Sequence, residues 1–396
     1  MAAWGDPGTT GPDGPAHHLW GGLLPEPQMP SGLFFAASIF EARSIMTDPA
    51  SSATSHAALG DRWSAFIARH HGLNRLARWG MSVLSLVGGV VTLVLFRRGP
   101  EYFPWLLGSL LLCWLAAVAF VQLRPRLEGR PWLRLAIDWS VQGLYQDVLI
   151  VLLPFYYAST TFLSGNGIFF LLLVAAAILT TFDPWYQAII LRWPLAGHLL
   201  FAFSFFASLN VALPLVGLRS GWGSPLAGGL AFMTLTPAIY RILPAGRGLR
   251  GMLPPILAVA GGLFAFWGIS EIRAWIPPTP LHLARGTLAR NVSALEPVEP
   301  RSAISVEELR AWNGVVCFTA IYAPPGLQEP ISHIWRKDGV VVATARLSPI
   351  HGGRAQGYRT YSRRPDLGPN PVGQWSVEIL TAHGQLIGRT RFAVTG

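Results

Sequence analysis

Four polar residues interrupt a mostly apolar stretch of the sequence and could carry chemistry there. Asp138, Gln142, Gln146 and Asp147 lie within residues 135–158, a stretch long enough to cross a bilayer. Steps of four residues place Asp138, Gln142 and Gln146 on one helical face. A carboxylate at bilayer depth costs a few kcal/mol, so we expect Asp147 to face other helices or a wet cavity. The group suits a polar path or a protonatable site, and hydrogen bonding between helices is the alternative interpretation.

A second polar group lies at the ends of other apolar segments. It comprises Asp183, Arg192, His198 and Arg241. If the N-terminus is cytoplasmic, all four fall on the cytoplasmic side, where they could converge on an anionic headgroup or a proton. Salt bridges that pin the helix ends are the interpretation that we favour.

A third group is basic and aromatic and lies near the C-terminus. It comprises Tyr358, Arg359, Tyr361, Arg363, Arg364, Arg389 and Arg391. Arginine pairs well with phosphate and carboxylate groups, so this surface could bind a phosphate, an acidic glycan or an acidic partner protein. Solvated strand faces would have the same composition.

No metal, cofactor or catalytic residue is predicted. His333, His351 and His383 are not spaced as metal ligands, and no cysteine pair or carboxylate cluster accompanies them. His333 and Trp335 point to the same face of a strand, which predicts a packed or hydrogen-bonded core histidine. The sequence also contains no Gly-rich phosphate loop and no Ser/His/Asp arrangement, so an enzymatic role is not favoured.

The composition is that of a membrane protein. Of 396 residues, 51% are hydrophobic and only 13% are charged, against about a quarter charged in soluble domains. The net charge of +10 comes almost entirely from arginines, many of which flank apolar segments. We therefore interpret the charge as a determinant of membrane topology, and we do not expect a nucleic-acid partner.

Seven apolar segments are each close to the roughly 20 residues that a helix needs to cross a bilayer. They are residues 79–96, 103–123, 135–158, 167–182, 195–218, 225–243 and 252–272. With the N-terminus inside, twelve arginines fall in cytoplasmic loops and flanks and four on the other side. This asymmetry predicts an inner-membrane protein with a cytoplasmic N-terminus and a periplasmic C-terminus.

The ends of the chain differ from this membrane domain, which we place at residues 79–276. Residues 1–60 are rich in Gly, Pro and Ser, which predicts a disordered or extended segment, and residues 61–78 fit a basic amphipathic helix at the membrane surface. Residues 277–396 form a separate domain. Strands are expected at residues 315–322, 331–336, 340–347, 358–362, 375–380 and 385–394, after a short helix that begins at a Ser305 to Glu308 capping box.

The expected fold class is thus an all-α membrane bundle of about seven helices followed by a small all-β, immunoglobulin-like sandwich. Several short motifs occur in a characteristic order in the second part: His333-Ile-Trp335, Asp338-Gly339, Tyr361-Ser-Arg363, Gly373-Gln-Trp-Ser-Val-Glu378, Gly384-Gln-Leu-Ile-Gly388 and Phe392-Ala-Val394. This set resembles the bacterial extracytoplasmic domain of unknown function numbered twenty-nine-fourteen. Leu153-Pro-Phe155, Ser159-Thr-Thr161 and Phe182-Asp-Pro184 resemble the uncharacterised multi-pass membrane proteins that carry this domain. The resemblance implies an architecture and no activity.

These patterns favour a non-enzymatic membrane protein that presents a periplasmic sandwich for partner binding. Such a protein would act as an accessory or scaffolding subunit of a larger membrane or envelope complex. Its expected partners are the lipid bilayer, a protein, and an anionic ligand or glycan at the arginine-rich face. A proton-coupled transporter built on Asp147 and an enzyme acting on lipid-linked substrate at the cytoplasmic rim are the alternatives.

Overall fold

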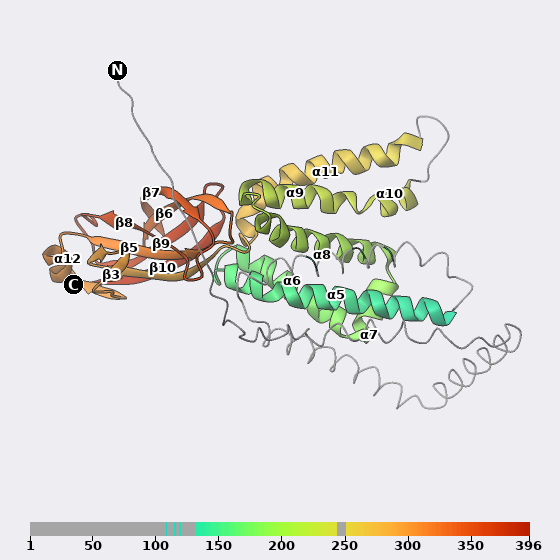
Figure 1. The fold of residues 1–396 in the computed structure, drawn as a ribbon, viewed down its shortest axis with the longest axis horizontal. Helices are drawn as coiled ribbons and strands as arrows, with labels where there is room; N and C mark the ends of the chain where they lie inside the picture. Colours follow the sequence, from blue (N-terminus) through green and yellow to red (C-terminus); the bar gives the residue numbers. More distant parts are fainter. Residues whose placement is uncertain (1–107, 109–114, 116–118, 120–130, 244–250) are drawn as a thin grey trace, which may run out of the picture. The chain divides into compact units, whose positions relative to one another are not determined.

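Seven α-helices precede the strands in the part of the chain that the structure describes (Figure 1). The structure is a computed structural model, and it describes residues 108, 115, 119, 131–243 and 251–396. The helices are α5 (Pro131–Ser159), α6 (Asn166–Thr181), α7 (Asp183–Tyr186), α8 (Pro194–Leu215), α9 (Ser220–Met233), α10 (Thr236–Ile242) and α11 (Leu253–Ile272). A π-helical turn, Gln187–Leu191, follows α7, and a 3-10 turn, Arg273–Trp275, follows α11. All described residues belong to one compact unit.

The prediction of a seven-helix transmembrane bundle is wrong. Only two of the described helices are long and apolar enough to cross a membrane, Leu195–Leu215 and Leu253–Trp275. A third span exists only if the pair Asn166–Thr181 and Asp183–Leu191 is counted as one, and this pair is bent by 99°. The predicted segments 79–96 and 103–123, the amphipathic helix 61–78 and the N-terminal residues 1–60 lie wholly or almost wholly outside the described residues.

The chemistry of the remaining segments explains the correction. Helix α5 has the length to cross a bilayer, but its polar residues lower its hydropathy below that of a span. The segment 225–243 is divided between α9 and α10, because the chain turns at Thr234 and Leu235 before Pro237 opens a new helix. The bend after α6 falls where Phe182 adopts an extended conformation and Pro184 begins the next turn.

The helices share an apolar core that α5, α6 and α8 build together. Leu149, Leu152, Leu173 and Val211 are fully buried in it. Helix α11 behaves differently: it packs closely on α9, beside which it runs in Figure 1, and it leaves large apolar side chains exposed on its other side. Phe264, the most exposed of these aromatic residues, is 69% exposed. An exposed apolar helix face of this size is typical of a surface that contacts lipid or another protein.

Strands make up most of the remaining chain. They are β1 (His282–Ala289), β2 (Asn291–Ser293), β3 (Glu296–Val298), β4 (Ala303–Ser305), β5 (Val315–Tyr322), β6 (Gln328–Lys337), β7 (Val340–His351), β8 (Tyr358–Arg364), β9 (Gly373–Thr381) and β10 (Leu386–Thr395). One sheet has the order β1-β5-β8 and another has the order β4-β10-β9-β6-β7, while β2 and β3 form a hairpin. A short helix, α12 (Val306–Ala311), begins at the predicted capping box, in which Ser305 and Glu308 bond reciprocally.

The two larger sheets enclose two clusters of buried apolar side chains between them. Cys317 of β5 packs with Trp335 and Trp375 in one cluster. Ile321 of β5 packs with Ile331 and Ile379 in the other. The sheet-rich C-terminal region predicted from the alternating pattern is therefore confirmed, with β5 to β10 close to their predicted positions. Strands β1 to β4 were missed. Three of them are only three residues long, and such short segments carry no recognisable alternation.

Candidate functional site

The polar face of α5 is a hydrogen-bonding surface toward α6 and α7. Gln142 Nε2 donates to the Thr180 carbonyl oxygen at 3.0 Å and to Asp183 Oδ1 at 2.7 Å. Gln142 and Gln146 are buried, and Asp138 is half-buried. The structure thus joins Gln142 to Asp183, two residues that the sequence pattern placed in separate groups. This contact holds the start of α7 against α5, which agrees with the interhelical alternative for these residues.

Asp147 does not have the interior position that was expected. Its side chain is exposed, whereas the neighbouring Gln146 is buried. One residue along a helix is a rotation of about 100°, so Asp147 is turned away from the face that Gln142 and Gln146 share. The Asp147 carboxyl is thus absent from the hydrogen bonds that join α5 to α6 and α7, although partial desolvation raises its pKa.

The other members of the predicted cytoplasmic rim are distributed over three elements. Arg192 is exposed just before α8, and His198 is half-buried in the first turns of α8. Arg241 belongs to α10, and its side chain lies outside the described part. Asp183, the remaining member, bonds to Gln142 of α5.

A buried polar network, which we call the joint, ties three helices to the segment that leads into β1. It consists of Tyr156 of α5, Asn210 of α8, Ser224 of α9 and Thr279 between Trp275 and β1. Asn210 Nδ2 lies 3.1 Å from Tyr156 Oη and 3.0 Å from Thr279 Oγ1, and Ser224 Oγ donates to Asn210 Oδ1 at 2.6 Å. All four side chains are at most 3% exposed. Its members are neutral amides and hydroxyls, which suit a structural connection.

The sandwich adds two direct contacts beside the joint. Gln385, in the β9–β10 turn, is fully buried and donates from Nε2 to the Ile276 carbonyl oxygen at 3.2 Å. Asn166, at the start of α6, is also fully buried and donates from Nδ2 to the Leu386 carbonyl oxygen at 3.2 Å. Gln385 and Leu386 belong to the Gly384 to Gly388 motif, so this motif contacts the helices.

His383 lies at the same end of the sandwich, against α9. A Cβ atom on Gly221 would come within 2.0 Å of His383 Nε2, so the glycine makes room for the imidazole. Partial burial, and then the positive charge of Arg273, lower the pKa of His383. Both effects favour the neutral form of the ring, which stays exposed on its other side.

Sequence reasoning did not identify the joint, although a signal was present. Asn210 is an amide in the middle of an otherwise apolar span, and Ser224 and Thr279 lie in small-residue and proline-rich contexts. A buried amide in a spanning helix needs partners, and a search for those partners would have led to the joint. The sequence could not show that the partners come from three different elements.

The predicted basic surface does not form a single patch. On β8, Arg359, Tyr361 and Arg363 point outward from the three-stranded sheet, while Tyr358 and Arg364 lie on the inner side with the buried Ser362. Arg389 and Arg391 point outward from the other sheet. Since the two sheets pack face to face, their outer surfaces are opposite sides of the sandwich.

Arg389 is also neutralised within its own sheet. Glu378 Oε1 accepts from Arg389 Nη2 at 2.7 Å, and Glu378 Oε2 accepts from Arg336 Nε at 2.8 Å. Both arginines are largely covered, with side chains 19% and 30% exposed. The cluster joins β6, β9 and β10 on the outer face, and it leaves Arg389 unsuited to binding a partner.

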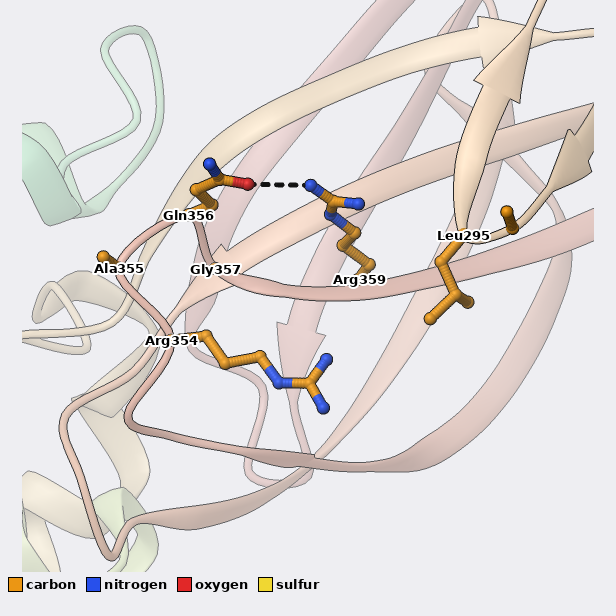
Figure 2. Close-up of a pocket in the computed structure, with 7 residues that line it drawn as sticks. Leu295, Arg354, Ala355, Gln356, Gly357 and Arg359 are labelled. Carbon is orange, nitrogen blue, oxygen red and sulfur yellow. Dashed lines mark hydrogen bonds between the residues drawn. The ribbon is translucent and has the colours of Figure 1, made fainter.

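The outer face of β8 borders a pocket of about 340 Å³. Figure 2 shows Arg354, Gln356 and Arg359 from the β7–β8 loop and β8 on one side, and Leu295 from the β2–β3 turn on the other. Arg359 Nη2 donates to Gln356 Oε1 at 2.8 Å, and Arg359 Nη1 pairs with Glu296 at 2.6 Å. Arg354 lies over the Tyr358 ring at 5.3 Å. The pocket thus combines arginine, amide and apolar groups, a mixture common at protein interfaces.

The histidine prediction for the sandwich core is confirmed. His333 is fully buried, with Nδ1 2.8 Å from Ser362 Oγ and Nε2 3.1 Å from Thr319 Oγ1. Burial lowers its pKa to about 4, so the ring is neutral at pH 7. Within residues 131–243 and 251–396, no three His, Cys, Asp or Glu side chains are arranged to hold a metal ion.

Comparison with known proteins identifies families and no activity. A family model described as a family of unknown function (DUF5924) matches residues 60–316, and one described as a protein of unknown function (DUF2914) matches residues 328–394. The second is the family that the C-terminal motifs resemble. No curated protein and no solved structure matches the chain. The first model covers more than half of the chain and continues from the helices through the joint into β5. The chain therefore belongs to the family of unknown function DUF5924.

Proposed function

We propose that this protein is a non-enzymatic membrane protein whose helices hold a β-sandwich in a fixed position for binding a partner. It would serve as an accessory or scaffolding subunit of a larger membrane or envelope complex. The joint is the observation that carries this proposal. A flexibly tethered domain needs no buried hydrogen bonds to its anchor. Here the side-chain amides of Asn210, Gln385 and Asn166 are buried and form hydrogen bonds between the helices and the segments of the sandwich.

Membrane insertion is part of the same proposal. The two candidate spans and the exposed apolar side of α11 support it. The arginine asymmetry of the sequence favours a bacterial inner-membrane location with the sandwich in the periplasm.

The outer face of β8 is the proposed partner-binding surface. Tyr361 is 45% exposed and Leu295 is 46% exposed, and arginines Arg354 and Arg363 flank them. Aromatic residues and arginine are enriched at interfaces, and the two arginines favour an acidic partner or an anionic glycan. No arrangement of the described residues favours the transporter or the enzyme alternative over this proposal.

Site-specific photo-crosslinking in cells tests this proposal. A photoreactive residue at Tyr361 should give a crosslink to one protein, identified by mass spectrometry, while the same residue at Arg391 on the opposite face should not. In the Asn210→Leu variant the crosslink at Tyr361 should weaken, because the sandwich would no longer be held in place. Absence of any protein crosslink from either face would reject partner binding by the sandwich.

A further inference from the structure

The loop between α5 and α6 has an apolar tip, which consists of Phe162 and Leu163. Leu163 is 86% exposed, more than any other large apolar side chain that the structure describes. The Phe162 ring packs on the rings of Tyr157 in α5 and Phe170 in α6, at centroid distances of 5.5 and 5.9 Å. Phe162 and Tyr157 are themselves exposed. The tip and the helix ends that it joins therefore present one apolar surface outward.

Hydrogen bonds hold this tip in a backbone conformation that leucine rarely adopts. Leu163 has a φ of 64°, in the left-handed region, which costs a leucine free energy and which asparagine tolerates better. Ser164 Oγ lies 2.6 Å from both the Thr161 carbonyl oxygen and Asn166 Oδ1, and Asn166 also bonds to Leu386 of β10. Packing within the chain does not account for an exposed leucine at this position, so its side chain indicates a contact outside the chain.

The sequence around the loop favours lipid as that contact. No charged residue occurs from Val148 to Phe182, a stretch that includes the second half of α5, the loop and all of α6. Protein interfaces usually surround their apolar centre with a polar rim, and charged groups there select the partner. The loop supplies no charged group, whereas hydrocarbon requires none.

The loop also lies at the end of a candidate membrane span. A Cβ atom on Gly165 would lie 3.6 Å from Trp275 Cδ2, so the loop packs against this indole. Trp275 is exposed and is the last residue of the candidate span Leu253–Trp275. Tryptophan and tyrosine are enriched where a membrane meets water, so Trp275 and Tyr157 both indicate that the loop lies at this depth.

We propose that Phe162 and Leu163 insert into the outer leaflet of the membrane, at the boundary between headgroups and acyl chains. This inference rests on the proposed membrane insertion and adds to it the place where a loop meets lipid. Because Asn166 connects the loop to β10, an inserted tip would also hold the β9–β10 end of the sandwich close to the headgroups.

Fluorescence quenching in vesicles tests the insertion. The full-length protein carries one dye on a cysteine introduced at Leu163, in a Cys113→Ala background in which the natural Cys317 is buried. It is reconstituted into vesicles of phosphatidylcholine and phosphatidylglycerol. Lipids with a nitroxide near the headgroup should quench most of the fluorescence, and lipids with a nitroxide near the bilayer centre should quench less of it.

Two other dye positions separate this proposal from membrane insertion itself. Leu263 is exposed near the middle of the candidate span and should be quenched best by the central nitroxide. Val340 is exposed and lies level with the start of β9, away from the β9–β10 turn, so neither lipid should quench it. Quenching at Leu263 but not at Leu163 would overturn the proposal and leave membrane insertion intact. No quenching at either position would contradict both.

A second variant tests whether the leucine side chain itself inserts. Leu163→Asn should have an unchanged or higher thermal midpoint in detergent, because asparagine tolerates the left-handed backbone, and it should clearly reduce the quenching of a dye at Phe162. The matched control is Leu295→Asn, the same change at a φ of 58° in the β2–β3 turn, which should not affect this dye. Equal quenching in the two variants would overturn the insertion of Leu163.

Photo-crosslinking in cells covers the alternative of a protein at this surface. A photoreactive residue at Leu163 should give no protein crosslink. A crosslink to one protein, together with no quenching at Leu163 in vesicles, would overturn the proposal in favour of a protein contact.

Discussion

Asn210 shows how one polar residue can connect several elements. Its amide group contacts side chains from α5, α9 and the segment before β1, and each of these is fully or almost fully buried. In a low-dielectric environment such bonds are costly to leave unmade, so each partner restricts the others. Gln142 plays a comparable part where α5 meets α7, because its amide donates a hydrogen bond to the Asp183 side chain.

His333 gives the sandwich a pH dependence that can be measured. Its pKa is about 4 in the folded state and about 6.5 when unfolded, so the unfolded chain binds the proton more readily. The stabilisation is complete above pH 6.5 and is lost as the pH falls toward 4, by about 1.4 kcal/mol per pH unit. Guanidinium denaturation of a fragment of residues 277–396 should show a lower midpoint at pH 5 than at pH 7. If His333→Gln shows the same decrease, another group is responsible.

The residue types predicted which side chains are buried. They were a poorer guide to which side chains lie together in one site. The alternation around His333 and Trp335 identified a core histidine, because strand period alone decides which face a side chain occupies. The basic residues of β8 and β10 were grouped by proximity in sequence, and a sandwich separates such residues onto opposite faces. Pairing between distant elements, as at Asn210, is not encoded in local spacing.

At the scale of elements, α9 and α11 pack through glycine. A Cβ atom on Gly229 would meet the Gly262 carbonyl oxygen at 3.0 Å, and one on Gly262 would meet Met233 Cγ at 3.0 Å. Small residues let helix backbones approach closely, which is the usual basis of helix association in membranes.

This packing predicts opposite effects for two glycine substitutions. Gly229→Ala should destabilise the protein by about 1–3 kcal/mol, because α9 and α11 must move apart. Gly268→Ala in α11 meets nothing within 4 Å and should be neutral or stabilising by up to about 1 kcal/mol through helix propensity. Thermal midpoints in detergent distinguish them. Equal shifts for the two variants would mean that the close approach is unimportant.

The sandwich should fold without the helices. Its core is closed by its own strands, with Trp375 1% exposed and stacked on Phe392 at a centroid distance of 6.1 Å. In the fragment of residues 277–396, Trp375→Ala should cost about 3–5 kcal/mol, and Val340→Ala, at a 69% exposed position, should cost little. Circular dichroism and denaturation measure both. An unfolded natural fragment would show that the contacts of Gln385 and Asn166 are required for folding.

The elements themselves were predicted unevenly, for physical reasons. Strands β5 to β10 were found because alternating side chains record which face is buried. Helix breaks were not found, because hydropathy averages over a window and does not register a 99° bend at Phe182 or the interruption at Thr234.

For the whole molecule, the proposed orientation predicts the location of the C-terminus. A reporter that fluoresces only in the cytoplasm should remain dark when fused after Gly396, because the sandwich is expected in the periplasm. The same reporter inserted after Arg124 should fluoresce. The reverse pattern would contradict the proposed orientation and, with it, a periplasmic partner.

The central claim is that the joint holds the sandwich in one position relative to the helices. The most direct test is the distance distribution between spin labels at two exposed positions, Leu172 in α6 and Arg346 in β7. The labels are attached to cysteines introduced there in a Cys113→Ala background, and the natural Cys317 is buried. We predict one narrow distribution for the natural joint, unchanged by Ser208→Ala, whose hydroxyl bonds within α8. Asn210→Leu should broaden it. A broad distribution before any joint residue is changed would contradict the claim.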